Sequence, residues 1–440
     1  MSDTAVRRAY AVLTSDDEGR VCRDIPESAC RVQPENFMRH VTSLAATKLG
    51  DGLVDPKLVL AWLMGALGAP VYLIGFLVPI REAGALLPQL FIAARIRAMP
   101  LRKWAWAAGS LIQGLAAIGI AAVALTLQGA SAGWAIVGLL TVFALARSIC
   151  SVSYKDVLGK TVSRSTRGTA TGTAGSLASA GVLLFGVLLG TGILVKEVET
   201  VAVVLLIAGG LWIAAAGLFT TLAEEPGATE GGGNPLAVAI AQFGLLRSDG
   251  QLVRFIVVRG LLIATALAPP YLLALAGAEQ DGGGLGGLGY FLIASSVAAL
   301  VGGYVWGRAS DRSSRKVLIA AGLLAAAAFA AAVLLDRLGG ALEAGGLLLP
   351  VLLFFLQLAY QGVRLARSTH LTDMADRDSR AAYTALSNTI VGVLLLGGAG
   401  VGFVASTFGE AAVMGLFAVM CVAASVVALG LKEVQRDDGD

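Results

Sequence analysis

Residues 285–335 read LGGLGYFLIASSVAALVGGYVWGRASDRSSRKVLIAAGLLAAAAFAAAVLL. Two long apolar runs, 285–309 and 315–335, lie on either side of a short segment, 307–316, that holds all the charged residues of this stretch. Because the hydrocarbon core of a membrane is about 30 Å thick, a helix needs roughly 20 apolar residues to cross it. The stretch therefore predicts two membrane-spanning helices that are joined by a charged turn.

The rest of the chain has a similar composition. Of its 440 residues, 56% are hydrophobic and 14% are charged, and the mean hydropathy is +0.78. These values exclude a water-soluble enzyme, and the net charge of +3 provides no basic field for nucleic acid. The apolar runs predict an all-α membrane protein with twelve transmembrane helices, near 37–66, 68–96, 103–127, 133–157, 167–195, 200–222, 251–276, 285–309, 315–335, 345–371, 380–407 and 410–431.

Cations are concentrated in alternate loops, and this pattern indicates how the helices are oriented. They occur in four loops, at 95–103, 155–167, 308–316 and 377–380. The intervening loops hold only Lys196 and Arg337. Since positively charged loops stay on the cytoplasmic side, both termini are expected in the cytoplasm. Residues 2–34 contain no apolar run typical of a signal peptide, so we expect an integral protein of a bacterial-type inner membrane.

An internal repeat divides the spans into two sets of six. At an offset of 213 residues, Pro56 aligns with Pro269 and Arg95 aligns with Arg308. Such a repeat predicts two pseudo-symmetric six-helix bundles. The expected parts are a cytoplasmic N-terminal segment, the first bundle, a flexible linker, the second bundle and a cytoplasmic tail, at 1–36, 37–222, 223–250, 251–431 and 432–440.

The charged segment also has a recognisable pattern. Residues 307–316, GRASDRSSRK, resemble the G-x-x-x-D-R-x-x-R-K loop signature of the major facilitator superfamily. Residues 48–53, KLGDGL, look like the N-x-G-D-x-x start that is common in its efflux-type members. The resemblance covers the chain after residue 36 and implies a central cavity lined by helices one, four, seven and ten. It also implies ion-pairing or gating roles for three side chains of the loop, Asp311, Arg312 and Arg315.

The sequence departs from the superfamily pattern in two places. Ala98, in the loop between spans two and three, stands where an acidic residue is typical, so gating is expected to depend on Asp311 of the second half. The fifth span, residues 169–192, lacks the G-P-x-x-G-G element of drug/proton antiporters. Classical multidrug antiport loses support accordingly.

Ionisable residues inside the predicted spans indicate function, because each costs about 2.5–3.5 kcal/mol at the centre of a membrane helix. Glu82 and Asp51 are the candidates for proton coupling, since a buried carboxyl group exchanges a proton as its arginine partner leaves and returns. Arg81 is expected to form an ion pair. An alternative for Asp51 is a purely structural pair with Lys48, which lies on the same helical face.

Two predicted spans carry a polar stripe on an otherwise apolar helix. Span four has Arg147, Ser151 and Tyr154 at helical spacing. Span ten has a second stripe at positions that the offset of 213 relates to the first. The candidate solute-binding set is completed by four residues of this second stripe and one mid-span residue of span eleven: Gln357, Tyr360, Gln361, Arg364 and Asn388. Because a guanidinium group binds carboxylate or phosphate oxygens, the stripes predict recognition of an anionic or zwitterionic group. The alternative is a permanent packing pair of Arg147 with Glu82.

These features together predict a secondary active transporter that moves a small anionic or zwitterionic solute by alternating access, in symport or antiport with protons. The expected partners are the solute, protons and membrane lipids, and the expected state is a monomer without cofactor, metal or nucleic acid. No G-x-x-x-x-G-K-[ST] loop occurs and the two histidines form no catalytic set, which disfavours ATP-driven pumping and an enzyme. Two alternatives stay open: an efflux pump for amphipathic compounds, and a non-transporting assembly factor or sensor of the same fold.

The N-terminal segment contains two of the four cysteines, Cys22 and Cys30. We expect both to be free thiols, because the segment is predicted to lie in the reducing cytoplasm. The same polar segment is the feature that keeps an assembly-factor function open, since it offers a surface to a partner.

Overall fold

The structure is a computed structural model that describes residues 3–14, 25, 27–195, 197–227, 229, 243–276, 287–338, 347–375 and 380–435. Within these ranges all regular elements are helices. Two short helices, α1 (Asp3–Thr14) and α2 (Glu27–Arg31), precede the first predicted span. Cys30 in α2 is disulfide-bonded, so the expectation of a free thiol is wrong there, whereas Cys150 and Cys421 are free and buried. Cys22 lies outside the described residues.

The first half of the chain forms nine helices among the described residues: α3 (Gln33–Leu53), α4 (Val59–Ala66), α5 (Val71–Ile74), α6 (Leu77–Leu86), α7 (Gln89–Arg97), α8 (Lys103–Thr126), α9 (Gly129–Thr161), α10 (Arg164–Gly190) and α11 (Val198–Thr220). Prolines explain why the first two predicted spans are broken into pieces. Pro56 lies in the break between α3 and α4, where it cannot donate a backbone hydrogen bond. Asp55 supports the restart, because its carboxylate accepts the backbone N–H groups of Lys57 (2.6 Å) and Leu58 (3.1 Å).

The described residues of the second half form α13 (Leu245–Ser248), α14 (Gly250–Leu261), α15 (Ala264–Leu267), α16 (Pro269–Leu275), α17 (Leu288–Arg337), α18 (Leu348–Met374), α19 (Arg380–Gly397), the 3₁₀ turn η1 (Gly398–Gly400), α20 (Val401–Phe408) and α21 (Glu410–Ala428). Helix α17 joins the two runs quoted above across a sharp kink at Ser313, whose φ is −166° and ψ is 97°. A helix also restarts at Pro269, which aligns with Pro56 at the offset of 213, since α16 begins there.

Among the described residues, nine helices are long and apolar enough to cross a membrane. This number counts the kinked α17 once, and it leaves out α3 to α7, which are individually too short or too polar. The prediction of a membrane protein with helical spans is therefore confirmed, whereas the number of twelve transmembrane helices stays a prediction.

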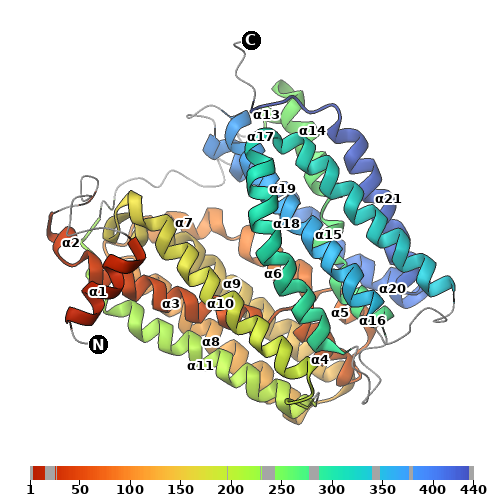
Figure 1. The fold of residues 1–440 in the computed structure, drawn as a ribbon, viewed down its shortest axis with the longest axis horizontal. Coiled ribbons are helices and arrows are strands. Elements are labelled where there is room, and N and C mark those ends of the chain that lie inside the picture. Colours follow the sequence, from red (N-terminus) through yellow and green to blue (C-terminus); the bar gives the residue numbers. More distant parts are fainter. Residues whose placement is uncertain are drawn as a thin grey trace.

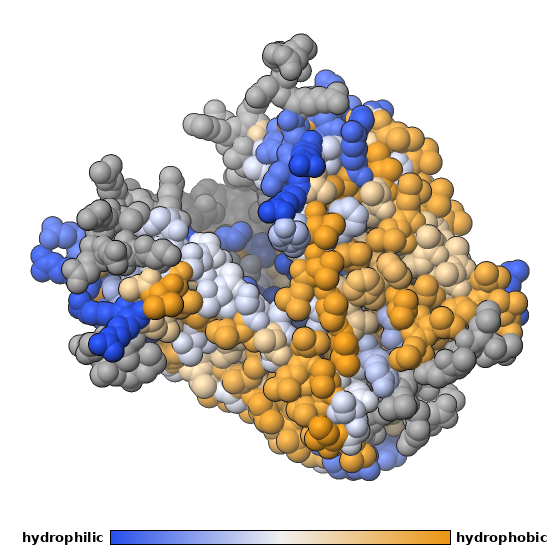
Figure 2. All heavy atoms as spheres, in the orientation of Figure 1, coloured by the Kyte–Doolittle hydropathy of each residue, from blue (hydrophilic) through white to orange (hydrophobic). Residues whose placement is uncertain are grey.

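The helices form two groups that touch along a narrow line and then diverge (Figure 1). Contacts between the groups involve α10 with α17, α6 with α19, α5 with α20 and α4 with α16. Figure 2 shows a recess between the two groups on the side where the chain termini lie, and a largely hydrophobic outer surface over the second group. An apolar outer surface is what contact with lipid tails requires.

The opposite end of the recess is closed by a tight helix crossing. A Cβ atom added to Gly402 of α20 would lie 2.7 Å from the carbonyl oxygen of Tyr72 and 3.1 Å from Cα of Gly75, so only glycine fits there. The ring of Tyr72 stacks on Phe403 with a centroid distance of 5.3 Å. The absence of a side chain at Gly402 thus allows α5 and α20 to pack closely.

Candidate functional site

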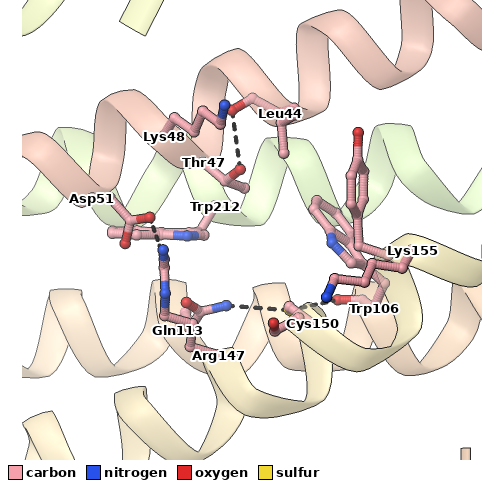
Figure 3. Close-up of a pocket in the computed structure, with 12 residues that line it drawn as sticks. Leu44, Thr47, Lys48, Asp51, Trp106, Gln113, Arg147, Cys150, Lys155 and Trp212 are labelled. Carbon is pink, nitrogen blue, oxygen red and sulfur yellow. Dashed lines mark hydrogen bonds and ion pairs between the residues drawn. The ribbon is translucent and has the colours of Figure 1, made fainter. Parts of the chain in front are cut away.

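A cavity of about 220 Å³ lies within the first group of helices (Figure 3). Its lining comes from α3, α8, α9 and α11: Leu44, Thr47, Lys48, Asp51, Trp106, Gln113, Arg147, Cys150, Ser151, Tyr154, Lys155 and Trp212. We call it the first cavity. It contains the complete polar stripe of the fourth predicted span, because the 3.6-residue repeat of α9 turns these three side chains toward α3.

Asp51 is the centre of charge in the first cavity. Its two carboxylate oxygens bind different arginines: Oδ1 accepts from Arg81 at 2.7 Å, and Oδ2 accepts from Arg147. The side chains of Asp51 and Arg81 are 19% and 12% exposed, whereas that of Arg147 is 37% exposed. Arg81 therefore holds the carboxylate from the protein side, and Arg147 is the partner that a solute can reach.

The same contact differs from the pairings that the alternatives gave for Arg147 and Asp51. Arg147 pairs with Asp51 on α3, and not with Glu82 on α6. Lys48, the expected local partner of Asp51, instead donates to the carbonyl oxygen of Thr171 at 3.2 Å. An ion pair does form in this region, but it joins three separate helices, α3, α6 and α9.

The rest of the first cavity offers polar groups without partners beside aromatic surface. Within the described part of the chain, the hydroxyl of Tyr154 and Oε1 of Gln113 are buried and have no hydrogen-bond partner. Ser151 is contacted by Gln89 at 3.5 Å, at the limit for a hydrogen bond. Figure 3 shows Asp51 and Arg147 on one side of the cavity and Trp106 with Lys155 on the other. Unsatisfied buried polar atoms are costly, so this arrangement suits a bound polar ligand.

A smaller cavity of about 30 Å³ lies between the two groups, and we call it the second cavity. Its lining is Glu82, Leu86, Arg259, Leu262, Ile263, Thr265, Ala266, Tyr360, Val363, Arg364, Arg367, Val391 and Leu395. It contains Tyr360 and Arg364 of α18, two residues of the second stripe. The first cavity lies within one group of helices and the second lies between the groups, so the equivalence of the stripes inferred from the offset of 213 stays a prediction.

Arg259 is the most buried arginine of the second cavity. It is 5% exposed, and its guanidinium group donates to Oγ of Ser387 and to Oδ1 of Asn388, the latter at 3.1 Å. Asn388 was expected to contact solute directly, and in the structure its amide oxygen orients Arg259. Nε of Arg259 is buried and has no partner among the residues that the structure describes.

Glu82 lies on α6 between the two cavities, and four cations act on it. Their charges come from Lys57, Arg81, Arg367 and Arg147. Lys57 is itself buried, with its ammonium group 3.7 Å from the ring centroid of Tyr360 on the other half. Glu82 is thus the carboxylate through which charges on both halves of the chain interact.

Three of the expected solute-binding residues, Gln357, Gln361 and Asn388, are not among those that line either cavity. Gln357 lies on α18 and is 5% exposed. Gln361, also on α18, packs against α17, where its Cβ lies close to Gly302.

The charged loop of the resemblance is tied to the end of the chain. Arg315 lies 3.8 Å from the carboxylate of Glu433 and donates to the carbonyl oxygen of Leu431 at 3.1 Å. Asp311 and Arg312 are exposed. A gating role for these three residues stays a prediction.

The first half holds its equivalent loop in a similar way despite Ala98. Glu224, which follows α11, accepts the backbone N–H groups of Arg102 (3.0 Å) and Lys103 (2.8 Å), and Arg102 pairs with Asp156. An anion at the start of α8 is favoured by the helix dipole. Glu224 and Glu433, which follow the last helix of each half, thus each contact the charged loop of their own half.

Sequence reasoning missed several residues in or beside the two cavities. Lys57, whose ammonium group lies over the ring of Tyr360, carried a clear signal, because it is a lysine in the middle of a predicted span. Trp106, Gln113 and Trp212 carried none, since such residues are common on any helix and only packing shows that they face a cavity.

Neither a protein-family model nor a curated protein sequence matches the chain. Solved structures do match. A mutant form of the nucleoside transporter NupG is 14% identical, with a TM-score of 0.69 over 90% of this chain and 100% of the other. A D-xylose-proton symporter is 12% identical (TM-score 0.69, 91% and 98% covered), and a POT family transporter in complex with 5-aminolevulinic acid is 9% identical (0.69, 90% and 95%). At these identities the likeness concerns the fold, and the chain therefore has the fold of major facilitator superfamily transporters.

Proposed function

We propose that the protein is a secondary active transporter that carries a small anionic or zwitterionic solute across a bacterial-type inner membrane. The observation that carries this proposal is the pair of arginines on Asp51, one of which is accessible from the first cavity. The matched structures support the transport of a small solute, because they include a nucleoside transporter, a D-xylose-proton symporter and a POT family transporter in complex with 5-aminolevulinic acid.

The state of the structure fits one step of alternating access. The recess is open on the side of the termini and closed at the crossing of Gly75 with Gly402. With the cation-rich loops placed in the cytoplasm, this is an inward-open state. The halves, residues 37–222 and 251–431, would then rock against each other as two bundles.

In the proposed binding step, a carboxylate or phosphate of the solute binds Arg147 in competition with Asp51. Arg81 stays on Asp51, so the released carboxylate oxygen keeps one cationic neighbour. A proton from water then neutralises Asp51 or the nearby Glu82 and moves with the cycle. Arginine keeps its own proton throughout, because the guanidinium group does not release it in this pH range.

A thermal-stability screen of the purified protein tests the choice of solute. A ligand at about 100 times its dissociation constant adds roughly 2.7 kcal/mol to the free energy of unfolding. We expect anionic or zwitterionic solutes to stabilise the wild-type protein and to lose this effect in Arg147→Ala. Stabilisation by apolar cations or lipids alone would contradict the proposal and favour amphipath efflux or an assembly function.

Proton coupling is tested with the same protein in liposomes. We expect an imposed pH gradient to accelerate uptake of the stabilising solute, and the acceleration to disappear in Glu82→Gln while exchange of solute without a gradient persists. A glutamine keeps the shape of the side chain but cannot carry a proton. Equal rates with and without the gradient in the wild-type protein would exclude both Glu82 and Asp51 as coupling groups.

A further inference from the structure

The two cavities differ in how their arginines are neutralised. In the first cavity, Arg147 and Arg81 share the carboxylate of Asp51. At the offset of 213 residues that relates the halves, Ala264 stands in the second half where Asp51 stands in the first. The second half thus has a stripe with arginines on α18, but it lacks a carboxylate at the position of Asp51 that would neutralise their charge.

The second cavity has an excess of positive charge. Among the described residues that line it, three are arginines, Arg259, Arg364 and Arg367, and one is a carboxylate, Glu82. That carboxylate is also acted on by Lys57 and Arg81, which belong to its own half. A guanidinium group that lines a poorly hydrated space without a counter-ion is costly, so the site favours a negatively charged ligand.

Arg259 shows that the site is built rather than incidental. Its bonded partners, Ser387 and Asn388, are neutral acceptors that orient the guanidinium group without cancelling its charge. Arg259 is only 5% exposed, yet its Nε has no hydrogen-bond partner among the described residues. Among the described residues, the charge that acts on it is that of another cation, Arg367.

The size of the cavity and the depth of the arginines define the ligand. The space of about 30 Å³ exceeds the roughly 10–15 Å³ that one water needs, and it admits a group of only a few atoms. Arg364 is exposed, Arg367 is half-buried and Arg259 is buried, so cations continue from the recess to the base of the cavity.

We propose that the second cavity binds a compact, doubly charged oxyanion, a phosphoryl or dicarboxylate group, on Arg259, Arg364 and Arg367. The proposal rests on the transport function proposed above and narrows it, because it selects anionic over zwitterionic solutes. Three cations against one carboxylate leave two positive charges, which match a dianion. Guanidinium groups also bind such oxyanions in a bidentate manner.

The test measures anion binding to the purified full chain in detergent by isothermal titration calorimetry, at constant ionic strength set with sodium chloride. The probes are inorganic phosphate, malonate and acetate. We expect phosphate and malonate to bind the wild-type protein more tightly than acetate does, and Arg259→Gln to weaken both by about tenfold or more. Arg254→Gln is the matched control, because Arg254 lies on the same helix but donates to the carbonyl oxygen of Gly430.

Equal affinity of the wild-type protein and Arg259→Gln for phosphate and malonate would overturn the proposal. If Arg259→Gln does not fold, the exposed Arg364 provides the second variant, Arg364→Gln, with the same expected loss and the same contrary result. A parallel titration with phosphatidylglycerol separates the possible sources of the oxyanion. Binding of the lipid alone, again lost in Arg259→Gln, would overturn the assignment to a solute.

The outcome also separates this proposal from the transport function. If a solute is transported and its affinity does not change in Arg259→Gln, the oxyanion site is wrong and transport stands. If phosphate and malonate bind through Arg259 but neither they nor any solute of the screen is carried into liposomes, the site stands and the transport function is wrong.

Discussion

Replacement of Asp51 by asparagine is expected to reduce transport by at least tenfold and to destabilise the protein by about 3 kcal/mol. Removing one partner of a buried ion pair leaves an uncompensated charge, which lowers the free energy of unfolding by about 3–5 kcal/mol. The lower value applies here because the side chain of Arg147 is 37% exposed. Here two guanidinium groups lose their carboxylate together. Transport is measured in liposomes, and stability by thermal unfolding of the detergent-solubilised protein.

Two further variants separate the role of Asp51 from a general loss of charge. Asp51→Glu keeps the carboxylate and is expected to recover part of the transport. Asp336→Asn removes a carboxylate that is exposed near the end of α17 and is expected to have no effect. Wild-type transport by Asp51→Asn would show that the ion pair serves neither solute recognition nor the cycle.

The second large effect is expected at the closed end of the recess. Leucine in place of Gly402 cannot fit, because its Cβ would lie 2.7 Å from the carbonyl oxygen of Tyr72. Overpacking costs about 1–3 kcal/mol, and each 1.4 kcal/mol shifts a two-state equilibrium about tenfold. We expect Gly402→Leu to separate α5 from α20, to depopulate the inward-open state and to lower transport by about tenfold or more.

Gly400→Leu is the matched control for this variant, because a Cβ at Gly400 meets no atom within 4 Å. Spin labels at two exposed residues of the closed end, Ile193 (70%) and Phe408 (72%), report its opening by pulsed electron paramagnetic resonance. We expect the distance between the two spin labels to be longer in Gly402→Leu than in the wild-type protein, and to be unchanged in Gly400→Leu. Identical distance distributions in the two leucine variants would contradict a role of this crossing in the cycle.

Features that repeat along the chain were predictable from the sequence. The polar stripe of α9 follows from helical periodicity, and the offset of 213 related it to Tyr360 and Arg364 in the other half. The stripe of α9 lines the first cavity, and Tyr360 and Arg364 line the second. Periodicity gives the face of a helix because the 3.6-residue repeat applies to every helix regardless of its neighbours.

Which residues meet across that face was not predictable. Arg147 pairs with Asp51 rather than Glu82, and Asn388 binds Arg259 rather than lining a cavity. Gln361 lies one residue from Tyr360 but contacts α17. A rotation of a helix by one residue, about 100°, exchanges such partners without any change in the apolar pattern.

The sequence by itself determined that this is a helical membrane protein of two related halves with charged groups inside its spans. Apolar length, loop charge and an internal repeat suffice for that, because a membrane admits few solutions for a backbone with unsatisfied polar groups. Only the tertiary structure decided that Asp51 serves two arginines while Arg259, Arg364 and Arg367 share no equivalent carboxylate. The balance of charge in a cavity depends on the rotations and crossings of several helices at once, and these follow from side-chain packing between segments far apart in the sequence.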